Sequence, residues 1–406
     1  MRRISQCFPR RGVVVLVLMA FSRIAMAEGM IDINPYFSTN VAYDDNLFKV
    51  SGKDEARLTL GSEAMSDTTT RLDAGVNVDW KISRQHVRLD MNFNQSRFNR
   101  FNFLNNDGYA RKLGWDWVLG SHLGGELSIS EARTMGGFTE IQNPVLNQRT
   151  SQRKVMNAHW DFHPRWRLHV QRDESESENS ANVYRSSNRQ DVGHEVMLQY
   201  TTPAGNRLGL TAREVKSEYP SRDRFQTLVF GNGNTQRDVA LNMVWNATGK
   251  TRFTGRVARI DRRYEELSER DIQDWTAQAG VYWQATGKTS VAVNAGRDIY
   301  GVDDIAATYV QNDSVSINPT WVATSKLMVQ ARAAYEKRSY QGDPGFLLGQ
   351  APVREDTLKS AGLTVTYTPH QKVRMQMAWQ KDKRESTLVN NGYDSSTLSA
   401  NVRIDF

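Results

Sequence analysis

The sequence predicts an all-β protein, a transmembrane up-and-down antiparallel β-barrel of about 18 strands that occupies residues 28–406. Three observations support this fold. Apolar and polar residues alternate along segment after segment, short turns alternate with long loops, and tryptophans cluster beside the short turns. Alternation with a period of two is typical of strands whose two faces meet different surroundings. In such a barrel the short turns are periplasmic and the long loops extracellular.

Residues 1–27 are predicted to be a cleaved signal peptide. Four arginines lie within residues 1–11, the apolar run GVVVLVLMAF follows, and AMA ends at Ala27. This order is that of a secretory signal and its cleavage site, and the apolar part is too short to span a bilayer. The single cysteine, Cys7, lies in this segment, so the mature chain has no thiol for a disulfide or for thiolate chemistry.

The composition of the rest excludes a bundle of membrane helices. Mean hydropathy of the full chain is −0.60, and no apolar run after residue 27 approaches the about 20 residues of a spanning helix. A secreted soluble protein fits this composition, and so does a barrel, in which only alternate residues face lipid. The signal carries five arginines and no acid, so the formal charge of +7 falls to +2 (7 − 5) and indicates no nucleic-acid partner.

The strands are expected on either side of eight tight turns. The turns are ISRQ (82–85), GSHLG (120–124), HPR (163–165), PAGN (203–206), TGK (248–250), TGK (286–288), VATS (322–325) and TPHQ (368–371). Eight hairpins make sixteen strands, and 33–43 and 394–406 add two more. An even number of strands places both termini of the chain on the short-turn side. A propeller is the alternative for a repeat of about 40 residues, but its strands would be shorter and more numerous.

Two copies of W-x-A-T-G-K-T, at 245–251 and 283–289, are predicted to be hairpin turns. A phosphate loop needs an earlier glycine, and Val244 and Tyr282 occupy that position. Alternating residues flank both copies, which is typical of a β-hairpin.

One face of the strands is predicted to line a water-filled lumen. In VRLDMNFN (87–94) and QKVRMQMAWQ (371–380), charged and amide side chains alternate with apolar ones. Hydrocarbon would not tolerate these charges, so that face should look inward. The residues predicted to face the lumen are Arg88, Asp90, Asn92, Asn94, Arg207, Arg213, Arg252, Arg256, Arg332, Arg374, Gln376 and Arg403. Acidic residues share this face, so the lumen suits neutral or weakly charged, hydroxyl-rich cargo.

The tryptophans separate a membrane barrel from a soluble sandwich, which would show the same alternation. They lie within a few residues of the short turns, where an interfacial girdle belongs. The predicted girdle residues are Trp80, Trp117, Trp160, Trp166, Trp245, Trp283, Trp321 and Phe406. Phe406, at the end of an alternating strand, also resembles the sorting signal read by the barrel-assembly machinery.

Other candidate sites are weaker. His159 and His169 should face each other near Asp161, which favours a solvated lumen pair over a metal site. YDDNLF (43–48) offers oxygen ligands but lacks the spacing of a calcium loop, so a turn is favoured. No catalytic motif is found, and we predict no enzyme activity, cofactor or metal. The loop at 44–69 is expected to be the longest and to fold inward.

Four segments resemble the EpsL-type exopolysaccharide export barrels, which are grouped with the β-barrel porins. These are INPYFSTNVAYDDNLF (33–48), SDTTTRLDAGVNVDWKISRQHVRLDMNFNQSRFNRF (66–101), TPAGNRLGLTAREVKSEYPSR (202–222) and the final strand. The resemblance implies a Gram-negative outer-membrane passage for an exopolysaccharide, with periplasmic polysaccharide-export components as partners besides membrane lipid. It carries over no catalytic residues. The alternative functions are a general or sugar-type diffusion porin, and then an outer-membrane hydrolase or a surface-binding barrel.

Overall fold

The computed structural model describes residues 31–140, 142–345 and 354–406. The predicted signal peptide lies outside these residues. The strands are β1 (Ile31–Asp44), β2 (Asp67–Ile82), β3 (Gln85–Phe98), β4 (Asn106–Leu119), β5 (Leu123–Met135), β6 (Gln148–His163), β7 (Trp166–Asn179), β8 (Arg189–Thr201), β9 (Arg207–Glu218), β10 (Gly233–Thr248), β11 (Thr251–Tyr264), β12 (Ile272–Trp283), β13 (Thr289–Gly301), β14 (Tyr309–Val322), β15 (Leu327–Gln341), β16 (Glu355–His370), β17 (Val373–Ser386) and β18 (Tyr393–Asp405).

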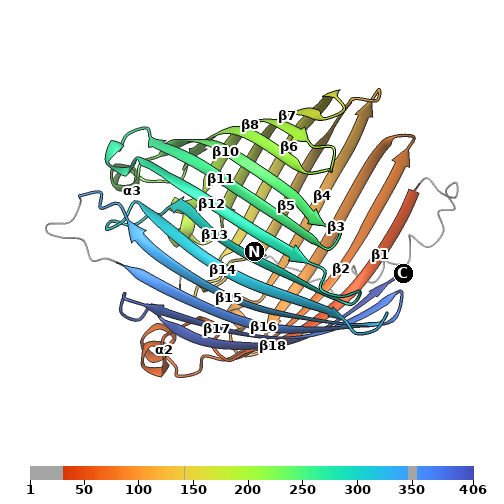
Figure 1. Ribbon diagram of the computed structural model, residues 1–406. Coiled ribbons are helices and arrows are strands. Elements are labelled where there is room, and N and C mark those ends of the chain that lie inside the picture. The colour runs from red at the N-terminus through yellow and green to blue at the C-terminus, as the bar shows by residue number, and fades with distance from the viewer. Residues whose placement is uncertain (1–30, 141, 346–353) are drawn as a thin grey trace, which may run out of the picture.

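The eighteen strands form one closed sheet (Figure 1). Each strand pairs antiparallel with the next in sequence, and β18 pairs with β1 from Tyr36 opposite Asp405 to Asp44 opposite Thr397. Closure removes the free edges, so that backbone groups in the wall can bond to neighbouring strands on both sides, as a membrane span requires. The prediction of an 18-stranded up-and-down antiparallel barrel is therefore confirmed.

The eight predicted tight turns join strands at one end of the barrel, where the C-terminus also lies (Figure 1). Both GKT motifs belong to these turns, and a strand rather than a helix follows each, which excludes a phosphate loop. The Thr248 hydroxyl accepts a hydrogen bond from the Lys250 backbone N–H at 3.1 Å. The Thr286 hydroxyl accepts two, from the N–H groups of Lys288 and Thr289 at 3.1 and 3.0 Å. The threonines thus cap the turns.

One loop is shorter than the sequence suggests. The polar composition of residues 175–187 is typical of a loop, but β7 continues to Asn179. The Gln190 amide donates to the Glu176 carboxylate at 2.7 Å across the pair with β8. Such cross-strand hydrogen bonds stabilise a strand whose composition alone resembles a loop.

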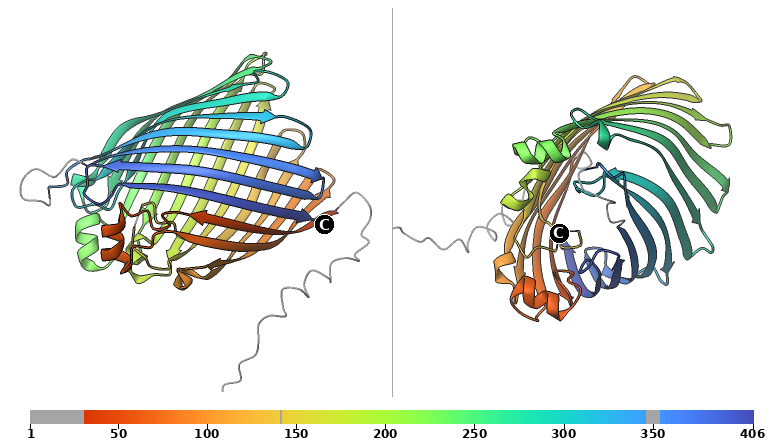
Figure 2. Two further views of the ribbon diagram at one scale, coloured as in Figure 1. Left: turned by 90° about the horizontal axis from the view of Figure 1, so that it is seen from below. Right: turned by 90° about the vertical axis from the view of Figure 1, so that its left-hand side faces the viewer.

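Helices lie at the opposite end from the short turns (Figure 2). They are α2 (Lys53–Leu60), α3 (Arg224–Phe230), η1 (Asn102–Leu104), η2 (Asn182–Ser187) and η3 (Ser268–Arg270). Within the described residues no helix is long and apolar enough to cross a membrane.

Loops at this end pack into two groups. The first comprises residues 45–66, 99–105 and the loop after β5, joined by a hydrophobic cluster. The cluster consists of Phe48, Val50, Ala56, Phe98, Leu104 and Phe138. The ring centroid of Phe48 lies 4.5 Å from that of Phe138 and 4.8 Å from that of Phe101. Burying one such side chain stabilises by about 1.5–3 kcal/mol, so the cluster holds these loops against one another.

The second group comprises residues 180–188, 219–232, 265–271 and 302–308, and buried arginines join it. Arg270 donates hydrogen bonds to the carbonyls of Val229, Val302 and Asp304 at 3.0, 3.3 and 2.5 Å. Burial lowers the pKa of Arg270 from its ordinary value. Arg222 forms an ion pair with Asp303 at 2.5 Å. Hydrogen bonds from guanidinium groups to carbonyls thus stabilise loops that have few buried apolar side chains.

Candidate functional site

One loop spans the mouth of the barrel. This crossing loop, residues 136–140 and 142–147, leads from β5 to β6. Arg338 Nη1 on β15 donates to Glu140 Oε1 at 2.8 Å, and Arg384 Nη1 on β17 donates to the Thr139 carbonyl at 2.7 Å. The strand β15 stands nine strands from β6 in either direction around the 18-stranded ring (15 − 6 = 9, 18 − 9 = 9). The loop therefore reaches the opposite wall.

These contacts identify the face of the wall that looks into the barrel, because Arg338 and Arg384 must point inward to meet the loop. Side chains alternate along each strand, and directly opposed residues of paired strands share a face. The registers carry this inner face around all eighteen strands. The twelve residues predicted to face the lumen lie on it: Arg88, Asp90, Asn92, Asn94, Arg207, Arg213, Arg252, Arg256, Arg332, Arg374, Gln376 and Arg403.

Many of these twelve side chains are held by polar neighbours on the inner face. The contacts are Arg88–Asp116 (2.8 Å), Asn77–Asp90 (2.5 Å), Asn92–Tyr36 (3.0 Å), Asn94–Asn92 (3.4 Å), Arg213–Asp173 (2.8 Å), Gln376–Thr366 (3.2 Å) and Arg403–Asp405 (2.7 Å). Arg403 also lies 3.7 Å from the ring centroid of Tyr36, and Arg252 lies 5.6 Å from that of Tyr282. Opposite charges are thus balanced locally along much of the wall.

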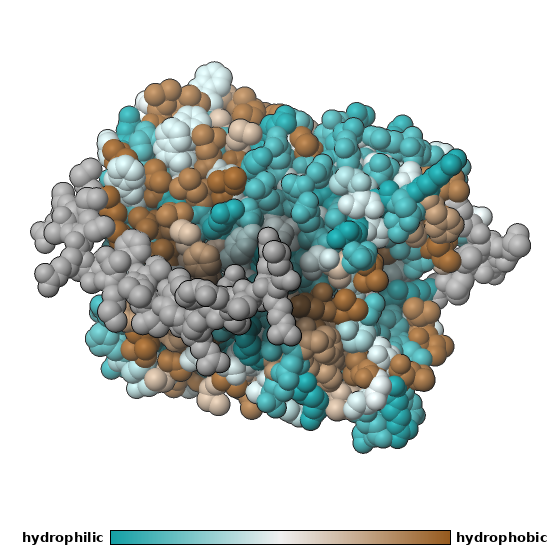
Figure 3. Space-filling view, turned by 180° about the vertical axis from the view of Figure 1, so that it is seen from behind, coloured by the Kyte–Doolittle hydropathy of each residue, from teal (hydrophilic) through white to brown (hydrophobic). Residues whose placement is uncertain are grey.

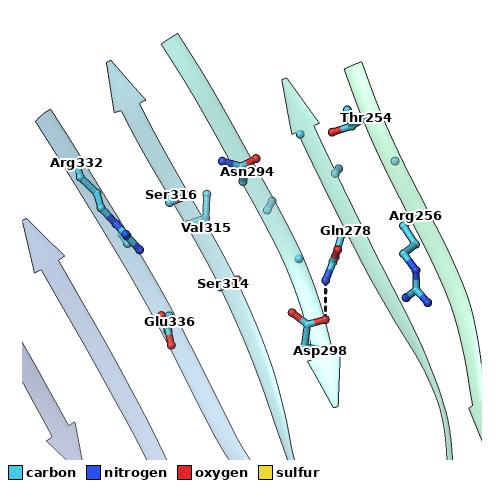
Figure 4. Close-up of a pocket in the computed structure, with 16 residues that line it drawn as sticks. Thr254, Arg256, Gln278, Asn294, Asp298, Ser314, Val315, Ser316, Arg332 and Glu336 are labelled. Atoms are coloured by element: carbon cyan, nitrogen blue, oxygen red, sulfur yellow. Dashed lines mark hydrogen bonds between the residues drawn. The ribbon is translucent and has the colours of Figure 1, made fainter. Parts of the chain in front are cut away.

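Four of the twelve residues lack such contacts, and all four are arginines. Arg207, Arg256, Arg332 and Arg374 have no side-chain hydrogen bond, ion pair or ring contact within the part of the chain that the structure describes. Arg256 and Arg332 line a recess of about 330 Å³ in the inner wall, formed by β11 to β15 (Figure 4). A second recess of about 300 Å³ adjoins it and includes Thr139 of the crossing loop.

The residues predicted to form an aromatic girdle lie on the outer face. By strand parity Trp80, Trp117, Trp160, Trp166, Trp245, Trp283, Trp321 and Phe406 point outward near the short-turn end. Several rings pack in pairs, with 4.9 Å between the centroids of Trp166 and Tyr200 and 5.3 Å between those of Trp245 and Phe253. An indole at this depth can place its N–H in the headgroup region and its ring in hydrocarbon.

A belt of outward ion pairs lies toward the loop end of the same face. The pairs are Arg111–Glu131, Lys154–Glu174, Arg172–Glu174, Arg237–Glu214, Arg263–Asp261, Arg297–Asp313, Lys337–Glu355, Lys359–Glu385 and Lys383–Glu385. Eight residues of β14 separate Trp321 from Asp313, which is about 20 Å along the membrane normal for a tilted strand. In Figure 3, apolar side chains gather toward the short-turn end of the visible face, at left, and a hydrophilic zone follows. The height of the apolar band on the outer surface therefore matches the hydrocarbon thickness of a thin bilayer.

The weaker candidates have local structural roles. His159 lies opposite His169, as predicted, but Asp161 is engaged by Arg167 at 2.6 Å. No cluster of three metal-ligating residues occurs in the described ranges. In the YDDNLF stretch, Asp44 accepts hydrogen bonds from the Asn46 N–H and from Lys49, at 2.9 and 2.8 Å. These carboxylate oxygens organise a turn, as favoured from the sequence.

The sequence did not indicate the crossing loop as a segment that narrows the lumen. Residues 45–66 do form the longest loop within the described chain, but the segment that reaches the opposite wall is the crossing loop. The longer loop instead supports it, through the contact of Phe48 with Phe138 and a hydrogen bond from Gln142 to the Lys49 carbonyl. Strand parity could have placed Arg338 and Arg384 on the inner face, but no pattern in the sequence indicates their partners nine strands away.

These features define the class of the protein: a closed 18-stranded barrel of the outer-membrane type, with a polar interior and an apolar outer band. A family model described as "Putative beta-barrel porin 2" matches residues 244–406, less than half of the chain. The match agrees with the porin grouping and does not confirm the EpsL-type assignment. No curated protein matches this sequence.

Solved structures give the same fold. The outer membrane protein OpdK of Pseudomonas aeruginosa is 12% identical with a TM-score of 0.52, over 92% of this chain and 99% of that one. OpdK solved with vanillate gives 11% and 0.51 with the same coverage. OccK2 (OpdF) of P. aeruginosa gives 11% and 0.52, over 92% and 98%. At this identity the likeness concerns the fold alone.

Proposed function

We propose that this chain is a passive channel for small hydrophilic solutes across the Gram-negative outer membrane. The observation that carries the proposal is a polar inner face, continuous around a closed wall, whose mouth is narrowed by a loop attached to the far side. Barrels of 16 to 18 strands leave an aqueous channel. The match to a porin model and the likeness in fold to the outer membrane protein OpdK support this function over a surface-binding barrel or a hydrolase.

Planar bilayers test the proposal. The protein without residues 1–27 is expected to give stepwise conductance, of lower unit size than an 18-stranded barrel without a crossing loop would allow. Proteoliposomes should swell in isotonic solutions of sugars the size of a monosaccharide and not in solutions of larger oligosaccharides. A protein that inserts as a folded barrel but passes neither ions nor sugars would contradict the channel function.

Export of an exopolysaccharide is the second candidate, and the resemblance to EpsL-type barrels is its basis. The inner face supports it in one respect, since its arginine, aspartate, asparagine and glutamine side chains can all hydrogen-bond to sugar hydroxyls. The crossing loop opposes it, because a polymer would have to displace a segment attached to β15 and β17. A deletion strain that retains normal surface polysaccharide would exclude export, whereas polymer accumulating inside the envelope would favour it.

A further inference from the structure

We propose that the inner wall between β11 and β16 holds a binding site for a hydroxylated monocarboxylate, of the size and chemistry of a sugar acid, with Arg332 as the carboxylate ligand. The inference deepens the proposed channel function and rests on it. Arg332 lines both wall recesses, together with Ala334 and Glu336 of the same strand. The second recess also includes Thr139 of the crossing loop, so it extends from Arg332 toward the narrowed mouth.

Two arginines without a side-chain partner, Arg256 and Arg332, line the first recess, and of the two only Arg332 also lines the second. The two carboxylates of the first recess already have donors: Gln278 donates to Asp298 at 2.8 Å, and Arg338 donates to Glu336 at 3.2 Å (Figure 4). Glu336 is four residues from Arg332 along β15, about 13 Å in an extended strand. An arginine without a carboxylate partner on a hydrated wall can accept a bidentate carboxylate from a solute.

The floor of the first recess is neutral and rich in hydrogen-bonding groups. One row of directly opposed residues runs Ala334, Ser316, Asn294, Gly280 and Thr254 across β15 to β11. The glycine and the alanine leave space above the sheet, and the hydroxyl and amide groups line it. Sugar hydroxyls, which both donate and accept, match such a floor, whereas an unsubstituted alkyl chain would leave these groups without partners.

The proposed site is tested by three probes on the purified barrel: glucuronate, glucose and butyrate. Each is titrated by calorimetry in detergent and by blockade of conductance in planar bilayers. Glucuronate should bind most tightly, because glucose lacks the carboxylate and butyrate lacks the hydroxyls. Equal binding of glucose and glucuronate would overturn the role of the arginine, and equal binding of butyrate and glucuronate would overturn the role of the floor.

Matched variants separate the site from the general charge of the lumen. Arg332→Gln should weaken glucuronate binding by about tenfold or more, the effect of one charge-assisted hydrogen bond. Arg207→Gln removes the same charge from the inner face on β9, outside both recesses, and should have little effect. Ser316→Ala should weaken glucuronate binding and leave butyrate unchanged. The inference fails if the two arginine variants behave alike.

The two measurements also separate this inference from the channel proposal. If the folded barrel does not conduct, the channel function fails, and calorimetry still decides whether the site binds glucuronate. If the barrel conducts and glucuronate neither binds nor blocks, the site is excluded and the channel stands. Different gel mobility of boiled and unboiled Arg332→Gln protein checks that this variant is folded.

Discussion

At the scale of single residues, the position of a side chain on the inner or outer face decides which surroundings it must tolerate. Neighbouring residues in one strand face lipid and water in turn. Met377 and Ala378 on β17 illustrate this, since Met377 is 61% exposed on the outer face and Ala378 shares the inner face with Gln376. The same substitution should therefore destabilise the barrel to very different extents at these two positions.

Met377→Lys is expected to destabilise the folded barrel in lipid by about 2–4 kcal/mol, because it places an ammonium group within the apolar band. Ala378→Lys should cost much less, since water in the lumen solvates the new charge. Denaturant unfolding of the barrel in lipid vesicles measures both. If the two lysines cost the same, our assignment of inner and outer faces on β17 is wrong.

The attachment of the crossing loop depends on individual side chains. Arg338→Gln is expected to weaken it by about 1 kcal/mol, a modest value because Glu140 is exposed to solvent and its ion pair is screened. The open time and the noise of single channels should increase, most clearly at low salt, where the native ion pair is strongest.

Lys337→Gln is the control for this variant. It removes a charge of the same sign from the outer face of the same strand, where Lys337 pairs with Glu355 at 3.1 Å. Conductance traces of the control should match those of the native protein. Equal noise in both variants would indicate a general effect of charge rather than release of the loop.

At the scale of elements, the loops have unequal roles although all extend from the same end of the barrel. The crossing loop spans the mouth, the loop at 45–66 supports it through a hydrophobic cluster, and the second loop group forms its own contacts around Arg270 and Arg222. These contacts predict how the loops depend on one another. Removal of the supporting loop at 45–66 should loosen the crossing loop, and removal of a loop that does not contact it should not.

Deletion of residues 138–145 is expected to raise single-channel conductance markedly, because it removes the segment between the two walls. Deletion of residues 50–65 should raise it less and add noise, since Val50 and Ala56 leave the cluster that contains Phe138. Deletion of 183–187 from the β7–β8 loop serves as the control and should leave conductance unchanged. A control that conducts like the first deletion would contradict the assignment of the constriction.

At the scale of the whole molecule, closure between β1 and β18 makes the barrel a single cooperative structure. In detergent the protein is expected to be rich in β-structure and to run at different positions on a gel when boiled and unboiled, because the closed sheet resists the detergent until it is heated. Circular dichroism and gel electrophoresis check this. A helical spectrum or a single gel position would contradict the closed barrel in solution.

The last residue contributes to closure and, we predict, to assembly. The Phe406 N–H donates to the Pro35 carbonyl at 2.9 Å, beside the pairing of the first and last strands. Deletion of Phe406 should lower the yield in the outer membrane, as expected for a signal read by the barrel-assembly machinery. Phe406→Ala keeps the backbone bond, so an equal loss of yield assigns the effect to the aromatic ring, and a normal yield assigns it to the backbone bond.

The sequence by itself determined the architecture, because that information is local. The alternation in residues 87–94, the turns around Gly249 and Gly287, and the tryptophans beside them each report on neighbours only a few residues away. Period-two patterns define which side chains share a face, and turn residues define where strands reverse. Eighteen strands and the placement of Arg88 or Trp245 on opposite faces follow from these patterns without knowledge of distant contacts.

Only the tertiary structure decided which loop spans the mouth and which inner arginines lack partners. Glu140 and Arg338 are 198 residues apart and meet because the closed wall brings β15 opposite β6. Loop length was the reason for expecting residues 44–69 to fold inward. The length of a loop does not determine where it extends, whereas contacts such as that of Phe48 with Phe138 do. The isolation of Arg332 likewise depends on which carboxylates its neighbours already bind. Such long-range pairing has no periodic signature, so it becomes visible only when the chain has closed on itself.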